Sequence, residues 1–167
     1  MVQEIVFKDA TLEDLPRIVE IYNSTIPGRM VTADTEPVTV EDRLPWFHEH
    51  SPSKRPLWVV KLGDEICGWV SLSNFYGRPA YGATAEVSIY LDANYRGHGL
   101  GKKVLSKVIE EAPTCKVGTL LGFIFGHNEP SLRLFASFGF EKWAHLPEVA
   151  ELDGVKRDLI IVGKKLK

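Results

Sequence analysis

The chain contains 167 residues, of which 44% are hydrophobic and 25% charged, and its formal net charge at pH 7 is −2. This length favours one domain with its own apolar core, over residues 1–167, and the nearly balanced charge gives no attraction for nucleic acid or an anionic membrane. The two cysteines, Cys67 and Cys115, are isolated, so we expect free thiols, no metal site and a cytoplasmic protein. The first residues do not resemble a signal peptide, and no stretch is apolar for long enough to cross a membrane.

The first predicted elements are a short strand over residues 4–8 and a helix over 12–24. Thr11 and Asp14 have the spacing of a capping box at the start of that helix. Residues 25–38 carry two prolines and a glycine without a regular period, which predicts a long loop. Since long ordered loops in compact domains often serve binding, this loop is a candidate to cover a binding site.

A second helix is predicted over residues 39–50, and two apolar runs at 57–62 and 65–73 predict a β-hairpin. Residues 75–82 contain glycine and proline and are expected to form a loop. The next strand, 83–91, alternates β-branched or aromatic residues with others. The first half therefore predicts a sheet interrupted by helices.

From Leu100 the apolar residues change to a helical period that continues to Ala112. The strand predicted at 118–125 has little polar interruption, so we expect it to be covered on both faces. A helix over 130–137 and strands at 140–146 and 155–162 complete the chain. The loop between the last two strands is expected to contain Pro147 and a turn at Asp153 and Gly154.

The most informative stretch is Arg96-Gly97-His98-Gly99-Leu100-Gly101-Lys102, between a predicted strand and a predicted helix. Glycines allow positive φ and a close approach of the main chain to a ligand. The first amides of a helix lack an internal acceptor, and the helix dipole favours an anion there. With three cations added, Arg96, Lys102 and Lys103, this turn is suited to a diphosphate.

Two common phosphate-binding loops fit this spacing poorly. A Walker loop needs four residues between its glycines and a serine or threonine after the lysine, whereas Gly97 and Gly101 are closer and residue 103 is lysine. In a dinucleotide loop two residues separate the last two glycines, whereas only Leu100 separates Gly99 from Gly101 here. A glycine-rich turn without any ligand is the third alternative.

Residues 96–101 match the Arg/Gln-x-x-Gly-x-Gly/Ala signature of the GCN5-related N-acetyltransferases (GNAT), which grips the pyrophosphate of acetyl-coenzyme A. Residues 128–140 resemble that family's second cofactor motif, Asn-x-x-Ser-x-x-Leu-aromatic-x-x-x-Gly-Phe. Short sequence motifs along nearly the whole chain, including Thr35-Glu36-Pro37 and residues 78–90, resemble those of the phosphinothricin (methionine sulfoximine) acetyltransferase subfamily. The resemblance implies an α/β (α+β) fold with a mixed, mostly antiparallel sheet of six to seven strands and about four flanking helices.

The resemblance also implies acetyl-coenzyme A as co-substrate. Its pantetheine arm is expected to pair with the main chain of the strand ending at Leu91, as an added strand would. Asn128 has a second interpretation, as the cap of the helix that follows it. The residues expected to bind the cofactor are Ser88, Ile89, Tyr90, Arg96, Gly97, His98, Gly99, Leu100, Gly101, Lys102, Asn128 and Ser131.

Two residues are candidates for proton transfer. Glu86 opens the cofactor strand, where the resembling subfamily has a glutamate with a proposed role as general base. Its alternative is a strand-end carboxylate paired with a surface cation. His145 is similar in position to a subfamily histidine proposed to assist, although a lone histidine is usually structural. Phe135 stands where the superfamily often has a tyrosine that protonates the thiolate, which leaves Tyr90, water or unaided departure.

For the acceptor, Arg78 and Tyr81 are candidates to hold a carboxylate, and Phe75 to form a pocket wall. Their alternative is an ordinary turn. The leading hypothesis is an N-acetyltransferase for a small amino acid or analogue, such as phosphinothricin, methionine sulfoximine or methionine sulfone. A protein Nα- or lysine acetyltransferase and a non-catalytic acyl-coenzyme A-binding module are the alternatives. By resemblance, we expect a homodimer.

Overall fold

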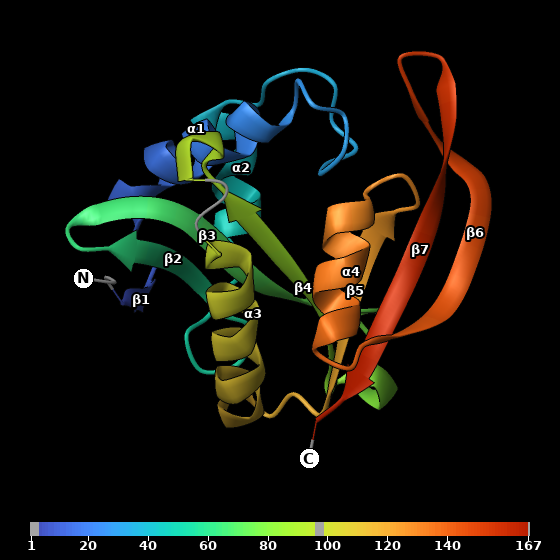
Figure 1. The fold of residues 1–167 in the computed structure, drawn as a ribbon. Coiled ribbons are helices and arrows are strands. Elements are labelled where there is room, and N and C mark those ends of the chain that lie inside the picture. Colours follow the sequence, from blue (N-terminus) through green and yellow to red (C-terminus); the bar gives the residue numbers. More distant parts are fainter. Residues whose placement is uncertain (1–3, 96–98, 167) are drawn as a thin grey trace.

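The computed structural model describes residues 4–95 and 99–166, and within them seven strands form one sheet (Figure 1). The strand order is β1-β2-β3-β4-β5-β7-β6. Neighbouring strands of this described sheet are antiparallel except β4 and β5, which are parallel. The strands are β1 (Ile5–Asp9), β2 (Leu57–Leu62), β3 (Glu65–Asn74), β4 (Thr84–Leu91), β5 (Thr119–Phe125), β6 (Glu141–Leu152) and β7 (Val155–Lys165).

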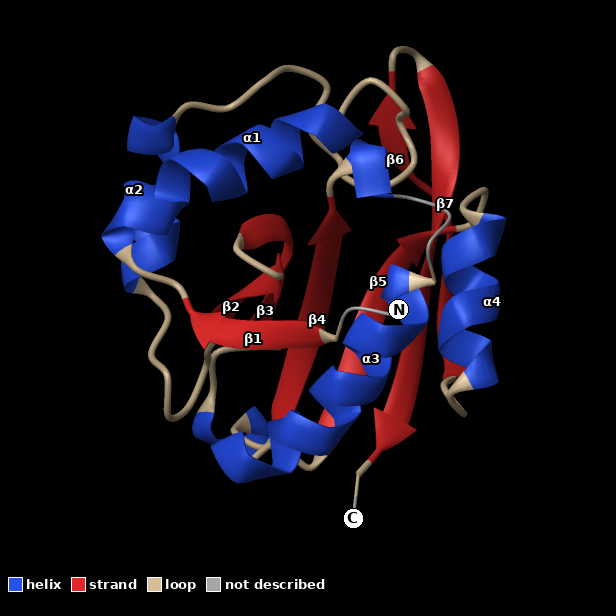
Figure 2. Cartoon of the chain, turned by 60° about the vertical axis from the view of Figure 1, so that its left-hand side comes forward, coloured by secondary structure: helices blue, strands red, loops and turns tan. Residues whose placement is uncertain are grey.

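Helices cover both faces of the sheet (Figure 2). On one face α1 and α2 pack over a core that includes Leu57, Val59 and Trp69. On the other face α3 and α4 pack over a larger core that includes Val87 and Leu120. No helix of the described residues is long and apolar enough to cross a membrane. The helices are α1 (Leu15–Thr25), α2 (Val40–His48), α3 (Leu100–Glu111) and α4 (Glu129–Ser137).

The predicted order of elements is confirmed, and three boundaries were wrong, one of them the end of the last strand, predicted at residue 162 and found at Lys165. The helix predicted at 12–24 is a 3₁₀ turn over Leu12–Asp14 followed by α1, with Pro16 in its first turn where no N–H is needed. The strand predicted to end at residue 146 continues to Leu152, because Pro147 lies inside an irregularity between Leu146 and Ala150, where the pairing with β7 needs no N–H from it. The capping boxes at Thr11 and Thr39 are both present.

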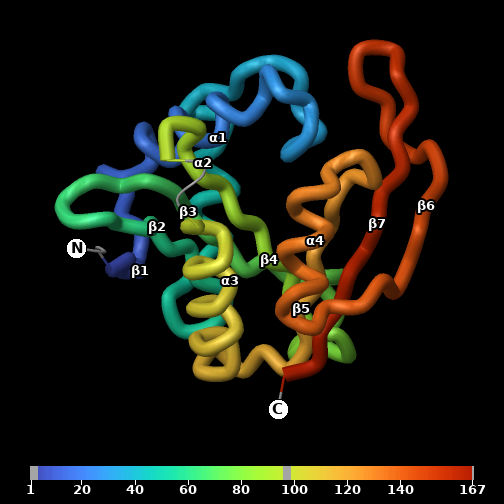
Figure 3. Tube along the Cα trace, viewed as in Figure 1, coloured from blue at the N-terminus to red at the C-terminus, as the bar shows by residue number. Residues whose placement is uncertain are grey.

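The feature that positions the site is the separation of β4 from β5. The two strands pair at three positions, where Thr84, Ala85 and Glu86 face residues 119–121. Beyond Glu86, β4 continues beside β3 and β5 continues beside β7, so the two strands diverge. Figure 3 shows the resulting opening along the Cα trace. In the described residues, the facing edges of β4 and β5 therefore have no strand partner beyond this point.

Candidate active site

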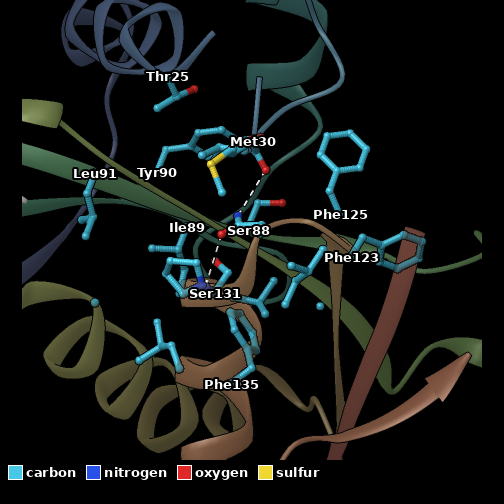
Figure 4. Close-up of a pocket in the computed structure, with 18 of the residues that line it drawn as sticks. Thr25, Met30, Ser88, Ile89, Tyr90, Leu91, Phe123, Phe125, Ser131 and Phe135 are labelled. Atoms are coloured by element: carbon cyan, nitrogen blue, oxygen red, sulfur yellow. Dashed lines mark hydrogen bonds between the residues drawn. The ribbon is translucent and has the colours of Figure 1, made fainter. Parts of the chain in front are cut away.

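A cavity of about 370 Å³ fills the opening between β4 and β5. Consecutive residues of both strands, 86–91 and 122–125, line it. Because alternate residues of a strand point to opposite faces, the cavity passes through the sheet. Thr25 and Met30 lie on one side of it, and Ser131 and Phe135 lie on the α4 side (Figure 4). Val31 next to Met30, Gly101 of α3, and Pro130 and Leu134 of α4 also line it. Two reactants can therefore meet in it from opposite sides.

The β4 edge that faces the cavity supplies the main-chain groups expected to bind an extended arm. Residues 88–91 all line the cavity, and their other edge is paired with β3. An extended ligand that pairs with this free edge would occupy the place of a strand. Ser88, Ile89 and Tyr90 thus line the cavity, and their binding of the coenzyme stays a prediction.

The predicted anion site begins at Gly99, the N-cap of α3. Its φ of 71° lies in the left-handed region that favours glycine. The amides of residues 100–102 occupy helix positions that have no internal acceptor, and the first helical bond is from Lys103 N–H to the Gly99 carbonyl, at 3.4 Å. Arg96, Gly97 and His98 lie outside the described residues, so Gly99, Leu100, Gly101 and Lys102 are the part of the predicted turn that is seen.

Glu86 lies at the vertex of the opening, as the last β4 residue paired with β5. Its carboxylate accepts no hydrogen bond from a described residue and forms no ion pair with one. Burial raises the pKa of Glu86 above its ordinary value, which makes this carboxylate a stronger base. The alternative of a carboxylate paired with a surface cation is therefore not seen in the described part of the chain.

Asn128 is buried, and its side chain has two protein partners. Its Oδ1 accepts a hydrogen bond from the Ser131 N–H at 3.3 Å, which confirms the predicted cap of α4. Its Nδ2 donates to the Met30 carbonyl at 3.1 Å, a contact that the sequence did not predict (Figure 4). Ser131 also lines the cavity, as expected of a cofactor-side residue.

His145 lies away from Glu86. Its Nε2 is 2.7 Å from Asp158 Oδ2 on the neighbouring strand, and this contact lowers the pKa of Asp158. The side chain lines a second cavity of about 440 Å³, together with His127, Lys142, Lys156, Arg157 and other residues. The structure therefore does not bring His145 and Glu86 into one cavity.

The predicted acceptor residues form an exposed cluster on the loop before β4. The rings of Phe75, Tyr76 and Tyr81 lie within 5.2–5.9 Å of one another, centroid to centroid. Arg78 is also exposed, and it precedes the 3₁₀ turn over Pro79–Tyr81. These residues are not among the described ones that line the through-sheet cavity, although their loop leaves β3 at Asn74, opposite Ala85.

The sequence reasoning missed the residues by which the long loop closes the cavity. The loop was predicted, and Met30 and Val31 from it line the cavity. Two apolar residues in a polar, proline-containing segment were the available signal. The strand β5 also departs from its prediction, because Phe123 is 37% exposed and lines the cavity rather than being covered.

A network under α1 supports the same loop. The Tyr22 hydroxyl hydrogen-bonds Thr32 and Asp34, and the Arg43 guanidinium lies 3.3 Å from Asp34 and 4.4 Å from the Tyr22 ring centroid. Tyr90 stacks on Trp69 at 4.6 Å beside it, and burial raises the pKa of Tyr90. Tyr90 is therefore a poor proton donor to a leaving thiolate, and Phe135 has no proton to donate.

Comparison with known sequences agrees with this arrangement. Residues 15–140 match the sequence model of the Acetyltransferase (GNAT) family. The chain is 53% identical over 154 residues to YwnH of Bacillus subtilis (strain 168), named "Putative phosphinothricin acetyltransferase", with 92% of this chain and 94% of that protein covered. It is 29% identical over 153 residues to the L-methionine sulfoximine/L-methionine sulfone acetyltransferase of Salmonella typhimurium (strain LT2), which covers 92% and 90% of the two chains.

A solved structure with a bound ligand has the same fold. This is yncA from Salmonella typhimurium with its cofactor acetyl-CoA, which superposes with a TM-score of 0.88 at 28% identity and covers 98% of this chain and 94% of that one. The divided sheet, the through-sheet cavity and these matches lead to one conclusion. The chain belongs to the acetyltransferase (GNAT) family, and it is an acetyl-CoA-dependent N-acetyltransferase.

Proposed function

We propose that this enzyme transfers the acetyl group of acetyl-CoA directly to the amino group of a small amino acid or analogue of the phosphinothricin, methionine sulfoximine or methionine sulfone type. The observation that supports this most strongly is the cavity that passes through the sheet with Glu86 at its vertex. Its acceptor side is covered by Met30 and Val31, which suits a small molecule better than a peptide chain. The names of the two relatives support the same acceptor class.

The coenzyme is held mainly by main-chain groups in this proposal. The amides at the start of α3, from Gly99 to Lys102, bind the diphosphate with Arg96, Gly97 and His98. The free edge of β4 from Ser88 to Leu91 pairs with the pantetheine arm, and one of its amides polarises the thioester carbonyl. The Ser131 hydroxyl contributes from the α4 side.

Glu86 takes a proton from the acceptor ammonium, directly or through a water. An α-amino group with a pKa near 8 is about 10% neutral at pH 7, so modest base assistance is enough. The neutral nitrogen attacks the thioester carbon and the C–N bond forms. The nitrogen is then positively charged and gives a second proton to water, and the C–S bond breaks to leave the amide. The coenzyme thiolate leaves with the electron pair, and solvent protonates it because Phe135 has no proton to give.

The acceptor's carboxylate is proposed to bind Arg78 and Tyr81, with Phe75 beside it. A guanidinium binds a carboxylate through two parallel hydrogen bonds, which orients the amine. His145 lies beside Asp158, and its assistance in removing the proton from the amine stays a prediction. We also propose a homodimer by family resemblance, which light scattering on the purified protein would test, with a monomer as the contrary result.

The test of the acceptor class is a thiol-release assay with acetyl-CoA. The panel holds phosphinothricin, methionine sulfoximine, methionine sulfone, the common amino acids, and peptides with a free amino terminus or a lysine. We expect acceptor-dependent release with at least one amino-acid analogue. Release with peptides alone would show a protein acetyltransferase, and coenzyme binding without release on any amine would show a binding module. Either result would overturn the proposal.

A further inference from the structure

The turn between β5 and α4 binds the loop that closes the acceptor side of the cavity. We call residues 29–31 of that loop the strap. His127 Nε2 lies 2.9 Å from the Arg29 carbonyl oxygen, and Asn128 Nδ2 donates to the Met30 carbonyl at 3.1 Å. Figure 4 shows Met30 over the cavity with this second bond dashed. Two successive residues of one turn therefore hold two successive residues of the strap.

The strap has an unfavourable local conformation that these contacts must maintain. Arg29 has a φ of 54°, in the left-handed region that residues other than glycine seldom adopt. Its guanidinium also contacts Asp153 of the β6–β7 turn, with Nε 2.5 Å from Oδ2, and donates to the Ile26 carbonyl at 2.7 Å. Tertiary bonds rather than local preference therefore fix the strap where Met30 and Val31 line the cavity.

Asn128 connects this strap to the coenzyme side. The same side chain caps α4 through Oδ1, and Ser131, Leu134 and Phe135 of α4 line the opposite wall of the cavity. The residue is 8% exposed, so its two hydrogen bonds are shielded from water. One amide therefore bridges the cavity wall on the coenzyme side and the wall on the acceptor side.

We propose that Asn128 is a positioning residue for the amine acceptor: its Nδ2 holds Met30 as the acceptor-side wall, separately from the cap that its Oδ1 provides. This inference rests on the proposed function, because it assigns the acceptor to the strap side of the cavity. It differs from the predicted role of Asn128 as a ligand of the coenzyme. Loss of the Nδ2 donor should weaken acceptor binding, whereas loss of the Oδ1 cap should destabilise the start of α4.

Substitutions can separate the two bonds of Asn128. Asn128→Asp keeps the size and the cap oxygen but loses the donor to Met30, and Asn128→Ser keeps a capping oxygen. Asn128→Ala loses both bonds. We expect the first two variants to keep the acetyl-CoA dissociation constant, while the acceptor KM rises about three- to tenfold and kcat changes little. Their melting temperatures should fall less than that of Asn128→Ala, because the α4 cap is kept. Asn128→Ala should raise the acceptor KM to the same extent as the other two variants, and its melting temperature should be lower than theirs.

Thr39→Ala is the matched control for a lost cap. Thr39 Oγ1 accepts from the Asp42 N–H at 3.1 Å at the start of α2, without touching the strap or the cavity. We expect this variant to lower the melting temperature and leave the acceptor KM unchanged. If Asn128→Asp instead weakens acetyl-CoA binding with an unchanged acceptor KM, Asn128 serves the coenzyme and the proposal is wrong.

Hydrogen exchange gives a measurement that does not depend on acetyl transfer. The Arg29 amide donates to the Ile26 carbonyl at 3.1 Å, so its exchange reports on the strap. Asn128→Asp should speed exchange at Arg29 and leave α4 unchanged. If the wild type acetylates no amine, the proposed function is lost while this measurement still reports on the strap. Unchanged exchange and an unchanged acceptor KM would overturn the inference.

Discussion

The two sides of the cavity are built in different ways. The coenzyme side uses main-chain groups, namely the edge of β4 and the first amides of α3, on regular elements that their own hydrogen bonds hold in place. The acceptor side uses side chains from loops, such as Met30, which are held by contacts across the chain. Main-chain recognition constrains few side chains, whereas loop recognition depends on each one. In the proposed function, we therefore expect substrate preference to depend on the acceptor side more than on the coenzyme side.

The largest expected effect comes from the residue between the two sides. Glu86→Gln keeps the shape of the side chain but removes the base, so kcat should fall about 10- to 100-fold at pH 7 with unchanged acetyl-CoA binding. Glu141→Gln, an exposed substitution at the start of β6, is the control and should change neither. Steady-state kinetics with the best acceptor would measure both. A kcat within threefold of the wild type would show that Glu86 is not the base.

On the coenzyme side, Gly99→Val should weaken acetyl-CoA binding about 5- to 30-fold, because a side chain destabilises the left-handed conformation. A Cβ at Gly99 would meet no atom of the described residues within 4 Å, so the effect expected from them is conformational rather than steric. Gly154→Val is a matched control, since Gly154 has a φ of 80° and equally open surroundings on the β6–β7 turn. Titration calorimetry should show weakened binding for the first variant only; equal affinities would contradict the anion site at Gly99.

On the acceptor side, Arg78→Ala should raise the acceptor KM about three- to tenfold and leave acetyl-CoA binding intact. Arg78→Lys should recover part of the loss, because it keeps the charge without the guanidinium fork. Arg133→Ala removes another exposed arginine, on α4, and serves as the control. An acceptor KM for Arg78→Ala equal to that of Arg133→Ala would remove Arg78 from the acceptor site.

The smallest expected effect concerns stability. Burial raises the pKa of Glu86 above 4.5, so the folded state binds its proton more tightly than the unfolded state does. The free energy of unfolding should therefore fall as pH rises from the unfolded pKa through the folded one, and the penalty should persist above it. Glu86→Gln should then melt slightly higher than wild type at pH 7, with a difference that disappears below pH 4. Equal melting temperatures at pH 7 would argue against this burial cost.

The same contrast explains what could be predicted from the sequence. Gly99 and the helical period from Leu100 predicted the start of α3, which the structure confirms, because local preference decides the conformation there. The contact between Asn128 and Met30 joins residues 98 positions apart, so no local pattern reports it. Pro147 indicated a loop, yet bulges within β6 absorb it because tertiary pairing with β7 outweighs its local preference. The three-residue pairing of β4 and β5 was likewise invisible in either strand alone.

The divergence of β4 from β5 also bears on self-association. Unpaired strand edges at the rim of a sheet are templates on which other chains can add strands and aggregate. Here the unpaired edge of β4 lies in the middle of the sheet, with α4 on one face and Met30 on the other. The edge therefore lies inside a cavity of about 370 Å³, and not at the rim of the sheet where a passing strand could add. The enzyme therefore keeps an edge that can form β-like hydrogen bonds with its coenzyme, without exposing that edge to other proteins.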